Sequence, residues 1–276
     1  MSKGVLCTVC PRGCMISEGN SGFCGGRINR NGEIIAGNYG RITSIALDPI
    51  EKKPLRRFHP GSYILSVGSY GCNLRCSFCQ NYRISMAKPR SEVMNMMPDE
   101  LAARAIDLVS QGNIGIAYTY NEPLIGYEYV RDCARLATDS GILNVVVTNG
   151  YISEKPLLEL LPLIDAFNID LKSFSPQFYI DIGGDLEVVK NSIRLAKAQC
   201  HVEVTTLIIP GENDSEEEMG KLAEWLSCLD PSIPLHISRF FPAYRMNDKN
   251  PTPKETINRL AGIARDYLQY VYEGNI

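Results

Sequence analysis

From Ile64 onward, short runs rich in β-branched residues alternate with amphipathic stretches of helical period. Repeated strand–helix units of this kind form a parallel sheet with right-handed crossovers, either as an open doubly wound sheet or as a barrel. A complete barrel needs eight units and the alternation shows six, so we predict an α/β fold with a partial (β/α)6 TIM-like barrel that is open on one side. The expected strands are Ile64–Ser69, Ile114–Thr119, Asn144–Thr148, Phe167–Leu171, Val202–Ile209 and Leu235–Phe240, and the expected helices begin near Pro98, Leu124, Glu154, Leu186, Ser215 and Lys254.

The first 60 residues precede this repeat and combine four cysteines with turn-rich sequence. We therefore expect residues 1–60 to form a small cysteine-rich metal-binding segment with little core of its own. Residues 61–276 are expected to form the partial barrel. Its C-terminal helix is expected to run to Gly274–Ile276, with no further module after it.

The composition is that of a folded protein without a membrane span. Of its 276 residues, 45% are hydrophobic and 21% are charged, the mean hydropathy is -0.10, and no long apolar run lacks charge. The first residues contain no apolar signal core, so we expect a cytoplasmic location. The net charge of -3 and the pI near 5.7 disfavour a nucleic-acid surface.

Three cysteines, Cys72, Cys76 and Cys79, follow the first expected strand directly. In a parallel barrel the reactive groups lie on the loops at the C-terminal strand ends. Three thiolates hold an iron–sulfur cube and leave one iron open to a ligand that is not protein. Zinc is the competing metal, but structural zinc sites normally close with four protein ligands and no histidine flanks this triplet. Three buried structural thiols are the remaining alternative.

A second cysteine group, Cys7, Cys10, Cys14 and Cys24, places four thiols within eighteen residues. Four thiolates suffice for a closed zinc site or for a second, fully ligated iron–sulfur cluster, and the spacing leaves both metals and a metal-free segment open. The other cysteines are expected to be ordinary interior thiols. They are Cys133, Cys200 and Cys228.

The spacing Cys-x3-Cys-x2-Cys, with the aromatic Phe78 before the last cysteine, resembles the radical S-adenosylmethionine (SAM) superfamily over most of residues 61–250. The resemblance implies a [4Fe-4S] cluster on Cys72, Cys76 and Cys79 whose open iron binds the amino and carboxylate groups of SAM. An electron from the cluster, supplied by flavodoxin or ferredoxin, then cleaves the sulfonium and yields a 5′-deoxyadenosyl radical that abstracts a substrate hydrogen. The cofactor carries the hard chemistry and the protein positions it.

The same resemblance implies that later strand ends hold the rest of the cofactor. Tyr120, Asn121 and Glu122 take the place of the superfamily's glycine-glycine-acidic stretch, so Glu122 is expected to pair with the methionyl ammonium. Each of these positions has a structural alternative: a turn, a buried ion pair or a hydrogen-bonded core histidine. The other expected cofactor contacts are Phe78, Thr148, Asn149, Asp170, Lys172, Thr205 or Thr206, and His236.

Five short segments resemble the branch near pyruvate formate-lyase activating enzymes that includes the radical proteins of the AmmeMemoRadiSam system. Glycyl-radical activases with auxiliary clusters commonly insert extra cysteines after the first triplet, whereas here they precede it. The resemblance covers nearly the whole chain. The segments are Cys10–Cys14, Gly22–Gly25, Asp48–Leu55, Cys79–Asn81 and Tyr120–Pro123.

The leading functional hypothesis is a radical enzyme that acts on a small molecule. In size and plan the chain resembles queuine lyase, which implies cleavage of a carbon–nitrogen bond in queuine to release a 7-deazaguanine precursor in queuosine salvage. The alternatives are an activating enzyme that installs a glycyl radical on a partner protein, and a zinc- or cluster-bearing binding module without turnover. The candidate substrate contacts are Asp48 or Glu51 for the guanine-like edge, Tyr39, Phe241 or Tyr244 for stacking, and Arg239 for an anionic group.

Overall fold

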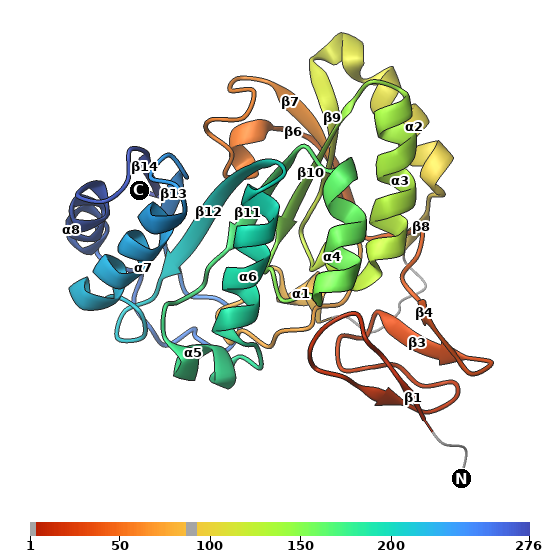
Figure 1. The fold of residues 1–276 in the computed structure, drawn as a ribbon, viewed down its shortest axis with the longest axis horizontal. Coiled ribbons are helices and arrows are strands. Elements are labelled where there is room, and N and C mark those ends of the chain that lie inside the picture. The colour runs from red at the N-terminus through yellow and green to blue at the C-terminus, as the bar shows by residue number, and fades with distance from the viewer. Residues whose placement is uncertain (1–3, 87–92) are drawn as a thin grey trace.

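A computed structural model describes residues 4–86 and 93–276 and shows a mixed α/β fold around one eight-stranded sheet (Figure 1). The sheet order is β14-β13-β12-β11-β10-β9-β7-β6. Six neighbouring parallel strands begin and end within one residue of the expected strands, and they confirm the partial barrel. They are β7 (Tyr63–Gly68), β9 (Asn113–Tyr118), β10 (Leu143–Thr148), β11 (Ala166–Asp170), β12 (His201–Ile208) and β13 (Leu235–Arg239).

The two outer strands of this sheet were not expected from the sequence. The strand β6 (Ser44–Pro49) pairs antiparallel with β7, and β14 (Val271–Gly274) pairs parallel with β13. The expectation that the last helix reaches the end of the chain is therefore wrong, because α8 ends at Arg265. Both strands are edge strands, where only one side is paired, and β14 is too short to show a period.

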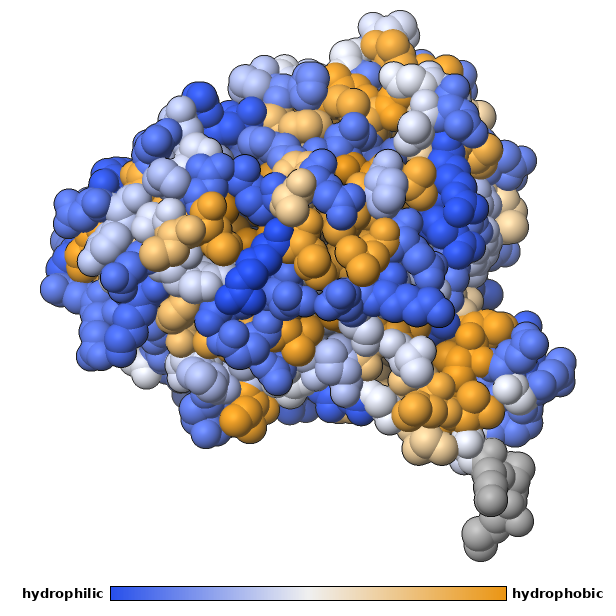
Figure 2. Space-filling model, viewed as in Figure 1, coloured by the Kyte–Doolittle hydropathy of each residue, from blue (hydrophilic) through white to orange (hydrophobic). Residues whose placement is uncertain are grey.

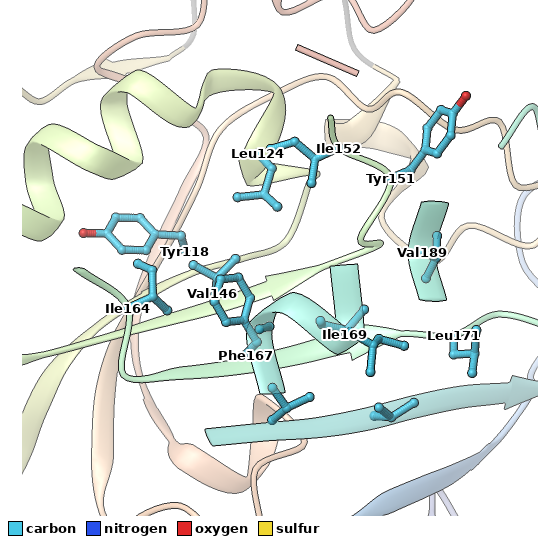
Figure 3. Packing of buried hydrophobic residues seen from close by; sticks show 14 of the residues in the cluster. Tyr118, Leu124, Val146, Tyr151, Ile152, Ile164, Phe167, Ile169, Leu171 and Val189 are labelled. Atoms are coloured by element: carbon cyan, nitrogen blue, oxygen red, sulfur yellow. The ribbon is translucent and has the colours of Figure 1, made fainter. Parts of the chain in front are cut away.

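Helices cover one face of the sheet (Figure 1), and apolar side chains of these helices are buried in the core beneath them. Buried side chains from β9, β10 and β11, among them Tyr118, Val146 and Phe167, pack in one core with residues of these helices (Figure 3). The exposed sides are mostly hydrophilic (Figure 2), as the amphipathic pattern predicts. The helices are α2 (Pro98–Asp107), α3 (Tyr127–Asp139), α4 (Glu154–Leu160), α5 (Pro176–Asp181), α6 (Leu186–Lys197), α7 (Glu216–Leu229) and α8 (Lys254–Arg265), with a short α1 (Tyr82–Ser85) after the cysteine triplet.

The N-terminal part of the chain forms small antiparallel pairs beside the barrel (Figure 1). They comprise β1 (Val5–Leu6) with β2 (Met15–Ile16), β3 (Arg27–Arg30) with β4 (Glu33–Ala36), and β5 (Arg41–Ile42) with β8 (Met94–Asn95). The division of the chain at residue 60 stays a prediction, and β6 shows that residues 44–49 share the main sheet. In the part that the structure describes, no helix is long and apolar enough to cross a membrane.

Candidate active site

A cavity of about 580 Å³ lies where the parallel strands end, and the cysteine triplet forms part of its wall. Its volume is in the range typical of small-molecule sites. Fourteen of the predicted site residues line this cavity, and they come from strands and loops that lie far apart in the sequence. They are Glu51, Cys72, Cys76, Phe78, Cys79, Tyr120, Asn121, Glu122, Thr148, Asn149, Asp170, Lys172, Thr205 and His236.

The loop after β7 is shaped by a glycine that no other residue can replace without strain. Gly71 has a φ of 94°, and a Cβ there would lie 2.6 Å from the carbonyl oxygen of Cys24. The next amide, that of Cys72, donates to the same carbonyl at 3.1 Å. Leu74 donates its N–H to Cys72 Sγ at 3.4 Å. The first thiol of the triplet is therefore fixed by its own backbone and by the N-terminal segment.

The thiols of the triplet form no disulfide, and the thiols of Cys72 and Cys76 are desolvated by burial. Burial raises the pKa of Cys76 to about 11, although the ammonium of Lys172 opposes this, and burial also raises the pKa of Cys72. A cluster iron binds the thiolate, so metal binding at this site would release the protons that the thiols of Cys72 and Cys76 otherwise keep. Cys79 Sγ lies 3.3 Å from Ser85 Oγ at the end of α1.

The donor set fits a cluster better than a single ion. Among residues 4–86 and 93–276, no three Cys, His, Asp or Glu side chains are grouped as a site for one metal ion. The three thiols instead line a common cavity that continues well beyond them. In a [4Fe-4S] cube each thiolate binds its own iron, so the sulfurs stand farther apart than around one ion. The residues present therefore fit the expected cluster, with room for a ligand beside it.

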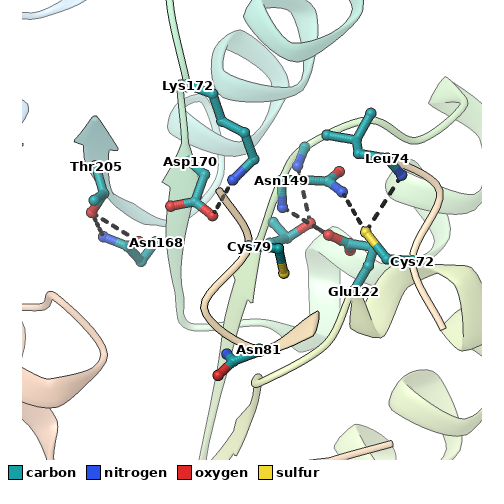
Figure 4. Close-up of polar contacts among 12 residues, drawn as sticks. Cys72, Leu74, Cys79, Asn81, Glu122, Asn149, Asn168, Asp170, Lys172 and Thr205 are labelled. Carbon is teal, nitrogen blue, oxygen red and sulfur yellow. Dashed lines mark hydrogen bonds and ion pairs between the residues drawn. The ribbon is translucent and has the colours of Figure 1, made fainter. Parts of the chain in front are cut away.

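Glu122 is the residue that we expect to contact the ammonium of SAM. Its carboxylate oxygens accept three hydrogen bonds from neighbouring residues (Figure 4). They accept from Thr148 Oγ1 at 2.7 Å, the Asn149 amide N–H at 2.8 Å and the Leu124 amide N–H at 3.0 Å. Burial raises the pKa of Glu122 to about 7, although these hydrogen bonds oppose the shift. A cation placed in the cavity would favour its charged form.

Asn149 connects this carboxylate to the triplet. Its side-chain amide contacts Cys72 Sγ at 3.7 Å and donates to Asn73 Oδ1 at 3.0 Å (Figure 4). The end of β10, which supplies Asn149, thus touches the loop after β7 directly. Such a contact keeps the strand end and the thiol in fixed relation, as a cofactor spanning both would require.

The ends of β11 and β12 supply two further polar pairs. Lys172 Nζ lies 3.0 Å from Asp170 Oδ2, and the Lys172 amide donates to Tyr179 Oη at 3.0 Å. Burial alone would lower the pKa of Lys172, but the charge of Asp170 and its hydrogen bond outweigh burial and raise it, so the ammonium stays charged. Thr205 Oγ1 accepts from Asn168 Nδ2 at 2.9 Å (Figure 4).

His236 belongs to a buried network that includes a residue we did not predict. Its Nε2 lies 2.6 Å from Glu203 Oε2, and Nε2 of His201 lies 3.0 Å from the other oxygen of that carboxylate. The backbone N–H groups of Arg56 and Arg57 also donate to Glu203. A glutamate inside the apolar run of β12 was the available sequence signal, because a buried carboxylate needs several donors.

The predicted substrate contacts are only partly brought together. Glu51 lines the cavity and accepts from the Gly61 amide at 2.7 Å. Asp48 stands behind the wall, where Lys53 Nζ lies at 2.8 Å and Tyr120 Oη at 2.7 Å, and these contacts hold its pKa below the usual range despite burial. Tyr39 lies elsewhere, because its hydroxyl donates to Asp132 at 2.8 Å and its ring packs on Tyr129.

The aromatic segment after β13 also stays off the cavity wall. Arg239 donates to the Thr252 carbonyl and stacks on the exposed Phe241 ring at 4.9 Å. Tyr244 stacks on Tyr82 at 4.6 Å. The structure therefore does not place these three predicted substrate contacts among the cavity-lining residues. The lining instead includes residues from the two sheet edges that sequence reasoning missed, among them Lys52, Arg56, Tyr272 and Glu273.

One expectation about the remaining cysteines is wrong. Cys133 is fully buried and Cys200 is partly buried, but Cys228 is exposed on α7. The buried stripe of this helix contains Leu222 and Leu226, and a residue two positions after Leu226 points away from it.

Comparison with known proteins establishes the family. A profile of the Radical SAM superfamily matches residues 66–224, more than half of the chain. The chain belongs to the radical SAM superfamily, whose members use a [4Fe-4S] cluster and SAM, and it is therefore identified as an enzyme of this class.

Particular relatives show the branch and the fold. An uncharacterised protein of Methanocaldococcus jannaschii is 42% identical over 99% of this chain and 81% of its own length. The pyruvate formate-lyase 1-activating enzyme of Escherichia coli K12 is 24% identical over 71% of this chain and 86% of its own length. The structure of Streptococcus suis SuiB bound to SAM has a TM-score of 0.59 at 12% identity, and it covers 76% of this chain and 51% of that one. These likenesses confirm the predicted superfamily, its branch and the fold.

Proposed function

We propose that this enzyme binds SAM in the cavity beside the triplet and acts there on a small organic substrate. Cys72, Cys76 and Cys79 would hold the [4Fe-4S] cluster. When bound, the cluster supplies the electron that breaks the sulfonium bond of SAM and so provides a 5′-deoxyadenosyl radical for hydrogen abstraction from the substrate. The observation that carries this proposal is the cavity of about 580 Å³, whose wall combines the three thiols with polar residues from six parallel strand ends.

The chain's own residues would bind and orient the cofactor. Glu122 is buried and lies in the loop that follows β9. Its charged form would pair with an ammonium. Lys172 is a partly buried cation in the same wall and offers a partner to a carboxylate. Thr148 and Thr205 supply hydroxyls within the same enclosure, where the low polarity of the surroundings strengthens each hydrogen bond.

We further propose queuine as the substrate to test first, with release of its 7-deazaguanine precursor. Glu51 supports this choice, because it lines the cavity and a carboxylate can accept hydrogen bonds from a guanine-like edge. Tyr120 and Tyr272 supply aromatic rings in the same wall. Arg56 also lines the cavity and offers a cation to an anionic or carbonyl group.

The test is an anaerobic assay of the reconstituted, reduced enzyme with SAM and queuine, in which 5′-deoxyadenosine and the released base are quantified by mass spectrometry. We expect both products, and we expect the Cys76→Ala variant to fall to the no-enzyme background. Cys228→Ser is the matched control, because that thiol is exposed and distant from the triplet in sequence. Deoxyadenosine formation without release of the base would reject queuine, and SAM cleavage by Cys76→Ala at the wild-type rate would reject the triplet assignment.

The second candidate function is activation of a glycyl-radical enzyme. The similarity to the E. coli pyruvate formate-lyase 1-activating enzyme over 86% of that protein's length favours it. It predicts a glycyl-radical signal in electron paramagnetic resonance (EPR) spectra when the reduced enzyme, SAM and a cognate lyase are mixed. A glycyl signal together with an inactive queuine assay would select this function over the lyase.

A further inference from the structure

The four N-terminal cysteines converge on one small hollow, although they lie in separate turns. Cys7 and Cys14 continue the β1–β2 hairpin, in which the Cys7 amide donates to the Cys14 carbonyl at 2.9 Å. Cys10 lies at the start of the turn between them, which closes on Gly13 with a φ of 58°. Cys24 enters from the following turn. All four are free thiols that line the hollow.

The surroundings of this hollow suit several thiolates. A Cβ on Gly22 would lie 2.9 Å from Ile16 Cδ1 and 3.7 Å from Cys14 Sγ, so this glycine leaves the sulfur its space. Arg27, only 4% exposed, also lines the hollow, but its guanidinium is already paired with the Glu128 carboxylate at 2.6 Å. Cys7 and Cys24 are themselves buried, and several thiolates together would be strongly repelled without a cation or a metal between them.

The arrangement of the thiols distinguishes the two metals that the sequence left open. Zinc bonds each thiolate at about 2.3 Å, so four thiolates around zinc lie close together. All four thiols line this hollow, yet among the residues that the structure describes no three Cys, His, Asp or Glu side chains are grouped as a site for one metal ion. A cube places one iron in front of each thiolate and therefore suits thiols that stand farther apart than those around zinc.

This hollow is also connected to the triplet. The Cys24 carbonyl accepts from the Cys72 amide at 3.1 Å. Asn73 lines the hollow and accepts from Asn149, whose side chain contacts Cys72 Sγ at 3.7 Å. A backbone hydrogen bond thus joins Cys24 of the N-terminal group to Cys72 of the triplet.

We propose that Cys7, Cys10, Cys14 and Cys24 hold a second [4Fe-4S] cluster that is fully ligated by the protein and adjacent to the first. Because all its irons have protein ligands, this cluster has no position for SAM. It would also brace the loop that carries Cys72, since the two groups share the backbone contact.

The test removes each group separately in the full-length protein and measures iron, sulfide and zinc after anaerobic reconstitution. The triple variant Cys72→Ala/Cys76→Ala/Cys79→Ala should retain about four iron atoms per chain, and wild type about eight. Its reduced EPR spectrum should not change when SAM is added. The double variant Cys7→Ser/Cys14→Ser should retain about four iron atoms, and its spectrum should shift with SAM.

Two controls make the result decisive. Cys228→Ser should hold as much iron as wild type, and a variant lacking all seven thiols gives the level of adventitious iron. A triple variant that holds only this level of iron, or one zinc per chain, would overturn the proposal. The triple variant decides the question even if the double variant aggregates, because its N-terminal segment is intact. Failure of the queuine assay would leave these measurements unaffected.

Discussion

Glu203 is a fully buried carboxylate in the middle of the sheet, yet it is completely satisfied. His201 and His236 contact its two oxygens, and the amides of Arg56 and Arg57 donate to the same pair. One side chain therefore anchors the segment beside β6 to β12 and orients His236 in the cavity wall. The network rests on contacts between residues up to 147 positions apart.

The charge of Glu203 makes a testable contribution to acid stability. Burial would raise its pKa, but the hydrogen bonds from the histidines and amides outweigh this and lower it from 4.5 to about 2. A depressed carboxyl pKa adds stability that is present above the unfolded pKa and is lost as the pH falls toward 2. We expect Glu203→Gln to lower the free energy of unfolding at pH 7 by about 3 kcal/mol and by much less at pH 3.

Urea unfolding of the metal-free protein at both pH values measures this difference. Glu217→Gln, in an exposed ion pair on α7, should change stability little at either pH. An equal loss for Glu203→Gln at pH 7 and at pH 3 would show that packing, and not charge, explains the effect.

At the scale of single elements, the β9–β10 pair shows how closely two parallel strands approach. A Cβ on Gly115 of β9 would lie 1.9 Å from the Leu143 carbonyl oxygen in β10. This backbone atom cannot move without disturbing the ladder. The glycine is therefore required by the approach of the neighbouring strand, and its φ plays no part.

We expect Gly115→Ala to destabilise the protein by about 3 kcal/mol, because the clash falls in the centre of the sheet. Gly262→Ala is the matched control: it lies inside α8 with nothing within 4 Å of the added Cβ, and we expect it to stabilise by about 1 kcal/mol. Thermal unfolding monitored by circular dichroism should move in opposite directions for the two variants. An unchanged midpoint for Gly115→Ala would contradict the register described for these strands.

The predictable elements are those with a strong period of their own. Helices α6 and α7 begin at or next to the predicted residues, and both have a side-chain N-cap, Asp185 and Ser215. The edge strands β6 and β14 were missed because their pairing depends on where the neighbouring strands end. Because the prediction did not include these two strands, it also missed the cavity-lining residues on or next to them.

At the scale of the whole molecule, an ion pair with a buried arginine helps to hold the N-terminal segment on the barrel. Arg27 of β3 lies 2.6 Å from Glu128 at the start of α3, and its side chain is only 5% exposed. It also donates to the carbonyl groups of Ile125 and Ile34. The pair therefore joins the second cysteine group to the element that follows Glu122.

We expect Arg27→Met to weaken this docking by about 3 to 5 kcal/mol, because it leaves the Glu128 carboxylate without its partner. Hydrogen exchange should accelerate in β1 to β4 while α6 and α7 keep their protection, as measured by mass spectrometry. Lys221→Met removes one member of an exposed pair and should leave both regions unchanged. Uniform acceleration across the barrel would indicate global destabilisation and not undocking.

The sequence by itself determined the six strand–helix units and the cysteine triplet after the first of them. Both are properties of neighbouring residues, a period and a spacing, which survive without knowledge of the fold. Only the tertiary structure decided that Glu122 meets Thr148, that Glu203 collects two histidines, and that Cys24 contacts Cys72. Such contacts join residues far apart in the chain, and strand order, register and packing settle them together.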